Sequence, residues 1–445
     1  MSPFLRLPLA TLVSAAVPLC GQVFIVDATG GAGSHFTDLP AAVAAVPDGA
    51  TLRVRAGSYN AFVLDGKGLA IVGEGTTTVS LGSVFLPTPI VVRRTGPGQA
   101  VLIKGLTLDC FLTQSSVEVQ QTAGPVVFHA VHARGDGIGF ALDRCANVLF
   151  HDCPLAPGTY AFGPSRRATV HAVDSTVELS HCDVRGHDQP RPSLVSGYPG
   201  DPGGTALSLV RSRGVLVSST VTGGLGSPGC NYARPIGCGV ATAGAGGKGA
   251  DADASTLVVI ASTISGNRGW DEWLDIQGPV RASDGGDGLT LRNASRATVL
   301  ASNLVGGPGG IPNGRAGAPS VVNAGSTLLI DATARPTRAE LLGTQARGQI
   351  IEFVARGAPL SPALFLLGDR ADVVPLEPLA SGSLLAAPTL VLGPFVLDSA
   401  GTLRSAVRLP PTWPIGQTWF AQALSAVPGP NTIWASNRVV LHVNH

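Results

Sequence analysis

The chain has 445 residues and a formal net charge of +1, which excludes a global electrostatic attraction to nucleic acid or anionic lipid. Only 13% of its residues are Asp, Glu, Lys or Arg, against about 25% in an ordinary soluble domain, and its mean hydropathy is +0.30. No run reaches the ~18 consecutive apolar residues of a membrane-spanning helix. The 58 Gly and 34 Pro residues favour many short strands separated by turns.

Residues 1–22 are predicted to be an export signal. Arg6 supplies a positive charge, residues 7–17 form a short apolar core, and residues 18–22 offer a cleavage region, with cleavage expected after Gly21. A lipoprotein interpretation based on Cys20 is the alternative. The mature protein is therefore expected to be secreted or held at the cell surface.

A helix and two strands are predicted next. Thr37 or Asp38 can cap the helix, and the sequence Pro47-Asp48-Gly49 ends it. Between them the apolar residues recur at helical spacing: Leu39, Ala42, Val43 and Val46. The strands are expected at residues 51–55 and 69–73.

Five later segments repeat one pattern, in which a β-rich run is followed by a small or polar pair and then by another apolar residue. They cover residues 147–155, 176–186, 214–223, 256–266 and 297–306. Each unit is too short to bury its own apolar face, so the units must stack. Parallel stacking predicts an interior column of Val184, Val221, Ile264 and Leu304. It also predicts a ladder of small residues made by Ser219, Ser262 and Ser302, with Cys153 and Cys182 in the same position.

The order of the N-terminal motifs, written FTxLxxAVxxxPDG, TLxVxxGxY and LxIVGEG, resembles the first coil of the pectin-lyase-like β-helix superfamily. The resemblance covers residues 23–330. It implies an all-β, right-handed parallel β-helix whose open end is plugged by the short helix. It implies activity only weakly, because one fold hosts many functions.

Residues 331–445 are predicted to form a C-terminal β-sandwich. Pro-rich turns separate short strand candidates at 349–354, 363–368, 395–398, 419–424 and 439–443. Residues 409–424 and 436–443 resemble a C-terminal β-sandwich module of secreted proteins from some environmental bacteria. That resemblance implies a role in capping, surface attachment or sorting.

Histidine is unevenly distributed, since six of the nine residues fall between positions 129 and 187. Equivalent positions on neighbouring coils lie about 4.8 Å apart, so residues distant in sequence can form one outward patch. The candidate catalytic residues are His151, Asp152, His181, Asp183, His187 and Asp188. The nearby candidate substrate-binding residues are Arg134, Arg144 and Arg185.

Several kinds of chemistry fit this patch. A lyase needs a base and a cation beside a uronate carboxylate, whereas a hydrolase needs paired carboxylates. The sequence Gly186-His187-Asp188 is faintly similar to a segment of pectin-degrading hydrolases, but their Asn-Thr-Asp, paired-Asp and Arg-Ile-Lys segments are missing. A His/Asp metal site and a purely structural role are the other interpretations.

Residues 267–275 form a second candidate site. Trp270 and Trp273 could stack on sugar rings, and Asp271 could hydrogen-bond hydroxyls or help to hold Ca²⁺. Alternatively, the two indoles cover an apolar strip. Residues 246–251 match the opening of a Ca²⁺-binding nonapeptide in a single copy. The Gly clusters at 223–224 and 306–310 are interpreted as turns.

The cysteines allow one specific expectation. Cys230 and Cys238 bracket a Gly- and Pro-containing loop, and an exported chain permits a disulfide between them. The remaining cysteines of the mature chain lie in apolar contexts and behave as small buried hydrophobes.

Three hypotheses from different classes follow. The chain is a polysaccharide lyase or glycoside hydrolase acting on an acidic polysaccharide, a non-catalytic glycan-binding or adhesive protein, or a structural cell-surface component. We favour a secreted carbohydrate-interacting protein whose partner is a polysaccharide or cell-surface glycan, with its catalytic status open.

Overall fold

The structure is a computed structural model. It describes residues 22–83, 86–87, 89–110, 116–135, 139–156, 168–189, 200–228, 242–275, 278–332, 338–342, 348–368, 370–375, 380–381, 383–387, 390–409, 418–426 and 433–442. The predicted export signal, apart from its last residue, lies outside the described residues. No helix in these ranges is long and apolar enough to cross a membrane.

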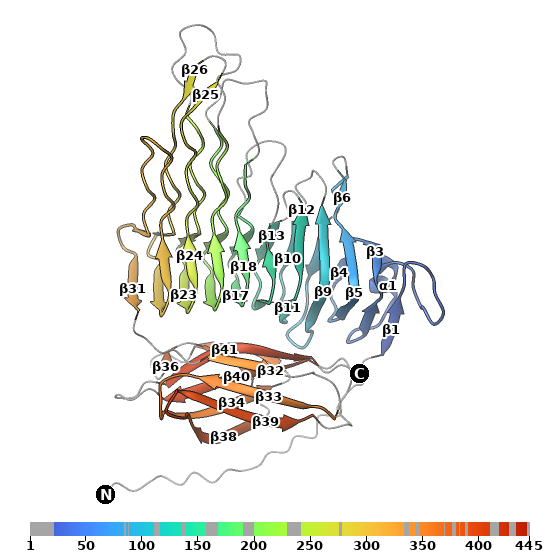
Figure 1. Cartoon of the computed structure of the whole chain (residues 1–445). Helices are drawn as coiled ribbons and strands as arrows, with labels where there is room; N and C mark the ends of the chain where they lie inside the picture. Colours follow the sequence, from blue (N-terminus) through green and yellow to red (C-terminus); the bar gives the residue numbers. More distant parts are fainter. Residues whose placement is uncertain are drawn as a thin grey trace, which may run out of the picture.

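Most of the described strands stack in parallel coils, as Figure 1 shows. Each full coil places one strand in each of three sheets, numbered here along the coil. Sheet 1 contains β4 (Val63–Asp65), β8 (Ile90–Arg93), β10 (Ser116–Gln120), β13 (Gly139–Asp143), β16 (Val170–Val173), β19 (Leu207–Val210), β22 (Ala250–Asp253), β27 (Leu289–Arg292) and β30 (Ser320–Val322).

Sheets 2 and 3 share two long strands, β5 (Ala70–Ser80) and β9 (Val101–Cys110), which bend from one sheet into the other. Sheet 2 adds β1 (Val23–Val26), β2 (Thr51–Val54), β11 (Val126–His129), β14 (Val148–His151), β17 (Thr176–Ser180), β20 (Arg213–Val217), β23 (Thr256–Ile260), β28 (Arg296–Leu300) and β31 (Thr327–Asp331). Sheet 3 adds β3 (Gly57–Asn60), β12 (His132–Gly135), β15 (Pro154–Leu155), β18 (Asp183–Arg185), β21 (Thr220–Thr222), β24 (Thr263–Ser265) and β29 (Asn303–Val305).

The strand register confirms the predicted fold class, an all-β chain built around a parallel β-helix. Val184, Val221, Ile264 and Leu304 pair in succession across β18, β21, β24 and β29. The first three are fully buried, so the predicted interior column is present.

Helix α1 (Leu39–Ala45) packs at the β1 end of the coils (Figure 1). The Asp38 carboxylate caps it by accepting a hydrogen bond from the Leu39 N–H, so Asp38 rather than Thr37 is the cap. Leu39, Ala42 and Val43 are buried in the same core as the strands, which confirms the predicted helix and its apolar face.

Two sharp corners in each coil connect sheet 1 to sheet 2 and sheet 2 to sheet 3. In most coils a single residue with positive φ makes each corner, for example Asp174 with φ 48° and His181 with φ 55°, whereas Asn293 and Ala294 share the corner between β27 and β28. This backbone region is uncommon outside Gly, although Asp, Asn and His tolerate it better than most residues. Stacking the coils therefore requires this backbone conformation at the same two positions of one coil after another.

The residue after each corner points inward and satisfies the backbone there. The Ser212 hydroxyl donates to the Val210 carbonyl at 2.8 Å and accepts from the Ser175 N–H at 3.1 Å. The Ser219 hydroxyl does the same with the Val217 carbonyl at 2.9 Å and the Cys182 N–H at 3.1 Å. Each serine thus pairs polar backbone groups that water cannot reach.

One of these ladders was predicted and the other was not. Ser219, Ser262 and Ser302 follow the second corner, with Cys153 and Cys182 in the same position. The first corner carries an equivalent ladder of Ser175, Ser212, Ser255, Ser295 and Ser326. Cys145 extends it by one coil.

Replacing Ser219 with Ala should lower the free energy of unfolding by about 1–3 kcal/mol, because it leaves the buried Cys182 N–H without its acceptor and removes one of the two donors to the Val217 carbonyl. Equilibrium urea unfolding measures the change. Ser218→Ala, at the half-exposed corner position next to it, is the control and should change stability by less than about 0.5 kcal/mol. Equal effects of the two substitutions would contradict the ladder's role.

The Gly-rich segments beyond sheet 3 form a packed array rather than isolated turns, which corrects the interpretation of the Gly clusters as turns. They are neither helical nor in strands, and they rise beyond β18 to β29 in Figure 1. Backbone hydrogen bonds join successive segments through Gly204→His187, Gly224→Gly204, Gly247→Gly224, Asn267→Gly247, Gly286→Asn267, Gly307→Gly286 and Gly317→Gly307, each written from N–H to carbonyl.

Glycine is required in this array by close contact between neighbouring backbones. A Cβ added to Gly247 would lie 2.2 Å from the Gly204 carbonyl oxygen, and one added to Gly307 would lie 1.9 Å from that of Asn267. Glycines recur three residues apart at 223/226, 244/247, 266/269, 285/288, 306/309 and 314/317. Extended chains packed through a glycine at every third residue resemble the arrangement in collagen.

Gly247→Ala should therefore destabilise the protein by at least about 2 kcal/mol, since neighbouring backbones must move apart to admit the methyl group. Gly98→Ala is the matched control, because a Cβ there meets nothing within 4 Å. Thermal unfolding of both variants tests this expectation. A Gly247→Ala variant as stable as Gly98→Ala would show that the array is loosely packed.

The C-terminal part forms small antiparallel sheets, as expected, beside the solenoid in Figure 1. Phe353, Phe365 and Leu397 lie in a core of their own. One sheet contains β32 (Arg338–Leu342), β33 (Ile350–Arg356) and β39 (Thr402–Arg408). A second contains β34 (Pro362–Gly368), β36 (Ala380–Ser381), β38 (Leu390–Val396), β40 (Thr418–Ala426) and β41 (Ile433–His442). Its assignment to a known sandwich module stays a prediction.

Three two-stranded sheets complete the described structure. They pair β6 (Gly82–Ser83) with β7 (Leu86–Pro87), β25 (Trp273–Asp275) with β26 (Gly278–Val280), and β35 (Arg370–Pro375) with β37 (Ser383–Ala387).

Candidate functional site

The corner between sheets 2 and 3 gathers histidines from successive coils. His129 and His151 are the last residues of β11 and β14 and pair directly in register, with Lys104 on the preceding coil and Ser180 on the next. The two histidines end nearly identical tetrapeptides, Val-Val-Phe-His129 and Val-Leu-Phe-His151. This similarity indicates that they occupy equivalent positions on neighbouring coils. His129 belonged to the histidine-rich segment but was not among the candidate site residues.

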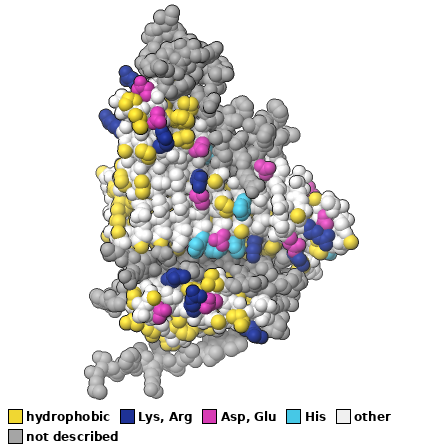
Figure 2. Space-filling view, viewed as in Figure 1, with side chains coloured by type: hydrophobic (Ala, Val, Ile, Leu, Met, Phe, Trp, Pro, Cys, Tyr) yellow, Lys and Arg dark blue, Asp and Glu magenta, His cyan; other side chains and the backbone are white. Residues whose placement is uncertain are grey.

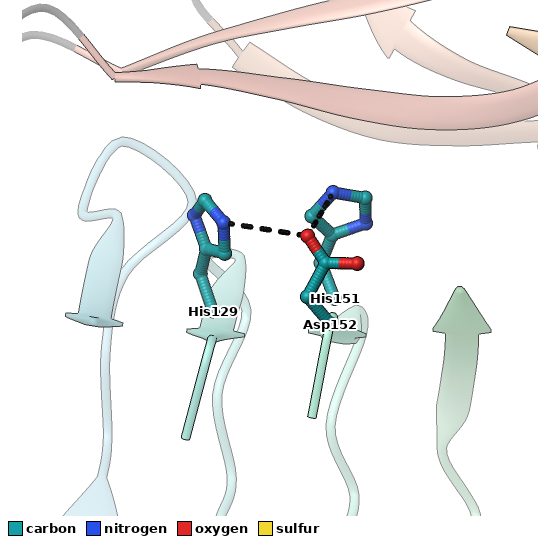
Figure 3. Close-up of side chains that lie close together, drawn as sticks. All are labelled: His129, His151 and Asp152. Carbon is teal, nitrogen blue, oxygen red and sulfur yellow. Dashed lines mark ion pairs between the residues drawn. The ribbon is translucent and has the colours of Figure 1, made fainter. Parts of the chain in front are cut away.

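Figure 3 shows His129, His151 and Asp152 pointing toward one another. Asp152 is the corner residue after His151, with φ 52°. Its Oδ2 atom lies 3.3 Å from His151 Nε2 and 3.9 Å from His129 Nε2. One carboxylate therefore faces two imidazoles from neighbouring coils.

The two rings and a third form an edge-to-face series along the corner. The ring centroids of His129 and His151 are 5.1 Å apart, and those of His151 and His181 are 5.6 Å apart. His181 is the next corner residue after Asp152 along the stack, and its Nδ1 lies 3.1 Å from the Ser180 hydroxyl. Figure 2 shows His side chains gathered at the boundary between the solenoid and the C-terminal sheets.

Burial favours the neutral form of the central imidazole. The His151 side chain is 11% exposed. Desolvation lowers the pKa of His151, Asp152 partly opposes this shift, and the positive charges of His181 and Lys104 reinforce it. Burial also lowers the pKa of Lys104. At neutral pH the His151 ring therefore offers a free nitrogen lone pair.

The other predicted catalytic residues lie elsewhere. Asp183 projects from sheet 3 and forms an ion pair with Arg185 at 3.0 Å. Asp188 accepts a hydrogen bond from the Leu225 N–H at 2.6 Å, inside the Gly-rich array. His187 is 1% exposed at the base of that array. The corner thus brings together His151, Asp152 and His181 of the six candidates.

The predicted binding residues are also dispersed. Arg144 pairs with Asp143 at the other corner, 3.0 Å away. Trp270 is half-buried against Ala243 and Val280, and its indole N–H donates to the Gly226 carbonyl. The Asp271 carboxylate accepts from the Ile311 N–H and from Arg268, and these bonds lower its pKa. The Arg134 and Trp273 side chains and the Cys230–Cys238 pair lie outside the described residues.

The outer face of sheet 3 presents a regular polar surface. One outward column aligns nine residues in register across the coils: Ser58, Thr78, Thr107, His132, Pro154, Asp183, Thr220, Thr263 and Asn303. A parallel column contains Asn60, Ser80, Asp109, Arg185, Thr222 and Ser265, and it ends at the exposed Val305. On this face β18 contributes the charged Asp183 and Arg185, whereas β21 and β24 contribute hydroxyl side chains.

Comparison with known proteins adds little to this geometry. No family model and no curated protein matches the chain. One matching solved structure is the crystal structure of the pectate lyase Pel9A, at 14% identity and a TM-score of 0.26. The match covers 70% of this chain and 77% of that one. The fold assignment therefore rests on the strand register described above.

The buried His187 predicts a pH dependence of stability. Burial lowers the pKa of His187 to about 4, below its ordinary value of 6.5. The unfolded chain therefore binds this proton at a higher pH than the folded protein does, and acidification between about pH 6.5 and 4 favours unfolding. His187 contributes its full stability above pH 6.5 and loses up to about 3 kcal/mol toward pH 4.

Urea unfolding at pH 7, 5.5 and 4.5 measures this dependence. A His187→Leu variant should lose stability less steeply on acidification than the wild type. A His132→Gln variant, which changes an exposed histidine on sheet 3, should keep the wild-type slope. An unchanged slope in His187→Leu would show that another group controls acid unfolding.

Proposed function

We propose that this chain is a secreted carbohydrate-interacting protein that binds an extended acidic polysaccharide along the outer face of sheet 3. The observation that carries the proposal is the pair of outward columns in which hydroxyl, amide and charged side chains predominate. They repeat at the spacing of the coils, about 4.8 Å, which is close to the length of one sugar unit in an extended glycan.

The side chains of this face suit sugar hydroxyls. The exposed Thr220 on β21 pairs in register with the half-buried Thr263 on β24, and the half-buried Thr222 pairs with Ser265. Hydroxyl groups both donate and accept hydrogen bonds, so each coil can contact one sugar unit in the same way. A flat, regularly spaced surface on a rigid solenoid also costs little conformational entropy on binding.

We propose an acidic ligand because of two side chains near the centre of this face, Arg185 and His132. The Arg185 side chain is 61% exposed and is held by Asp183 at 3.0 Å. A guanidinium can bind a uronate carboxylate through two parallel hydrogen bonds. His132 lies two coils before Asp183 in the same column and is exposed. These groups favour a polymer that carries carboxylates over a neutral one.

Charge reversal at Arg185 tests the proposal. Arg185→Glu should weaken binding of an acidic polysaccharide at least tenfold, about 1.4 kcal/mol, because it replaces a carboxylate-binding group with a repulsive one. Arg211→Glu is the matched control, since Arg211 is 57% exposed and pairs with Asp174 at 2.8 Å on the other corner. Isothermal titration with pectate, alginate and a neutral glucan of similar length gives the affinities.

The same panel separates binding from catalysis. Release of unsaturated products, followed by ultraviolet absorbance, would identify a lyase. Retention without products would identify a binding protein. Failure of wild-type protein to bind any acidic polysaccharide, or equal losses in the two variants, would overturn the proposal.

A further inference from the structure

We propose that His129, His151 and Asp152 form a binding site for a divalent transition-metal ion of the zinc class, which links two neighbouring coils. This site lies on the corner between sheets 2 and 3. The inference is independent of the proposed glycan-binding face.

The three donor atoms lie within 4.8 Å of one another, and the carboxylate is near tetrahedral spacing from the two imidazoles. Within the described part of the chain they are the one group of three His, Cys, Asp or Glu side chains whose ligand atoms all lie within 4.8 Å of one another. Two donors bound to a tetrahedral zinc ion at about 2.1 Å lie about 3.4 Å apart. The 3.3 Å separation of His151 and Asp152 matches this, and the 3.9 Å separation of His129 and Asp152 requires a shift of about half an ångström.

The donor set selects the class of ion. Two imidazoles and one carboxylate suit zinc and its neighbours, and three protein ligands leave a fourth position for water. Calcium instead takes six to eight oxygen donors, so the corner does not fit Ca²⁺. The residues considered for Ca²⁺ in the sequence, 246–251 and Asp271, lie away from this corner.

The backbone holds these ligands in place before any ion arrives. His129 and His151 end paired strands and are fixed by the register. Asp152 is fixed by the corner conformation, and Cys153 after it is anchored in the interior ladder. The His129 and His151 side chains are 12% and 11% exposed, whereas that of Asp152 is 52% exposed. The imidazoles are therefore restrained by packing, and the carboxylate leaves a path for an ion to enter.

Lys104 is the one feature of the column that opposes a cation. It precedes His129 in register and is close enough to His151 to affect its pKa. Removing this charge should therefore strengthen metal binding, which gives a variant with an expected gain.

Titration of the full chain with Zn²⁺, after removal of bound metal with a chelator, tests the site. Wild-type protein should bind one Zn²⁺ per chain, and Asp152→Asn should bind it at least about tenfold more weakly. Asn tolerates the corner conformation as well as Asp does, so the variant should fold. Asp174→Asn makes the same substitution at the equivalent residue of the other corner, with φ 48°, and should bind like the wild type.

Co²⁺ in place of Zn²⁺ gives a second readout, because a tetrahedral cobalt site absorbs visible light. Wild-type and Asp174→Asn proteins should show this absorption, and His129→Gln and Asp152→Asn should not. Lys104→Met should bind Zn²⁺ several-fold more tightly. Absence of saturable binding below about 1 mM Zn²⁺, unchanged affinity in Asp152→Asn, or weaker binding in Lys104→Met would overturn the proposal.

Discussion

The hydrogen bonds at the coil corners are the interaction on which the rest of this structure depends. Each corner turns the chain through positive φ and leaves polar backbone groups facing an apolar interior. The serine that follows a corner donates to a carbonyl of its own coil and accepts from the N–H of the equivalent residue on the preceding coil, and the next coil repeats the arrangement. This fixes the stacking register, because a slip by one residue would leave the hydroxyls outside and the backbone groups unpaired.

A fixed register converts sequence positions into columns. In the outward column at the end of sheet 2, Lys104, His129 and His151 occupy the early coils, whereas Val217 and Ile260 occupy the later ones. The polar part forms the histidine corner, and the apolar part is buried in a small cluster of its own. The outer face of sheet 3 is organised in the same way, with hydroxyls on one coil after another. A solenoid thus places distinct surfaces side by side through small changes at equivalent positions.

The Gly-rich array extends the same principle beyond the strands. Its segments are held by backbone hydrogen bonds between coils and by contacts too close for any side chain at Gly247 or Gly307. Asp188 and His187 belong to the base of this array, which explains why they do not join the corner histidines. Both residues follow Gly186, the first glycine of a packed segment in this array.

The sequence by itself determined the solenoid, its helical cap, one interior column and one of the two serine ladders, because period-2 burial and a repeated motif are local signals. It also located the histidine-rich coils. Only the tertiary structure decided which of these side chains meet. His129 lies 22 residues from His151, yet pairing of their strands places them in one column, while Asp183 and His187 leave it. Irregular loops make coil lengths unequal, so this juxtaposition depends on backbone pairing between coils and not on spacing along the chain.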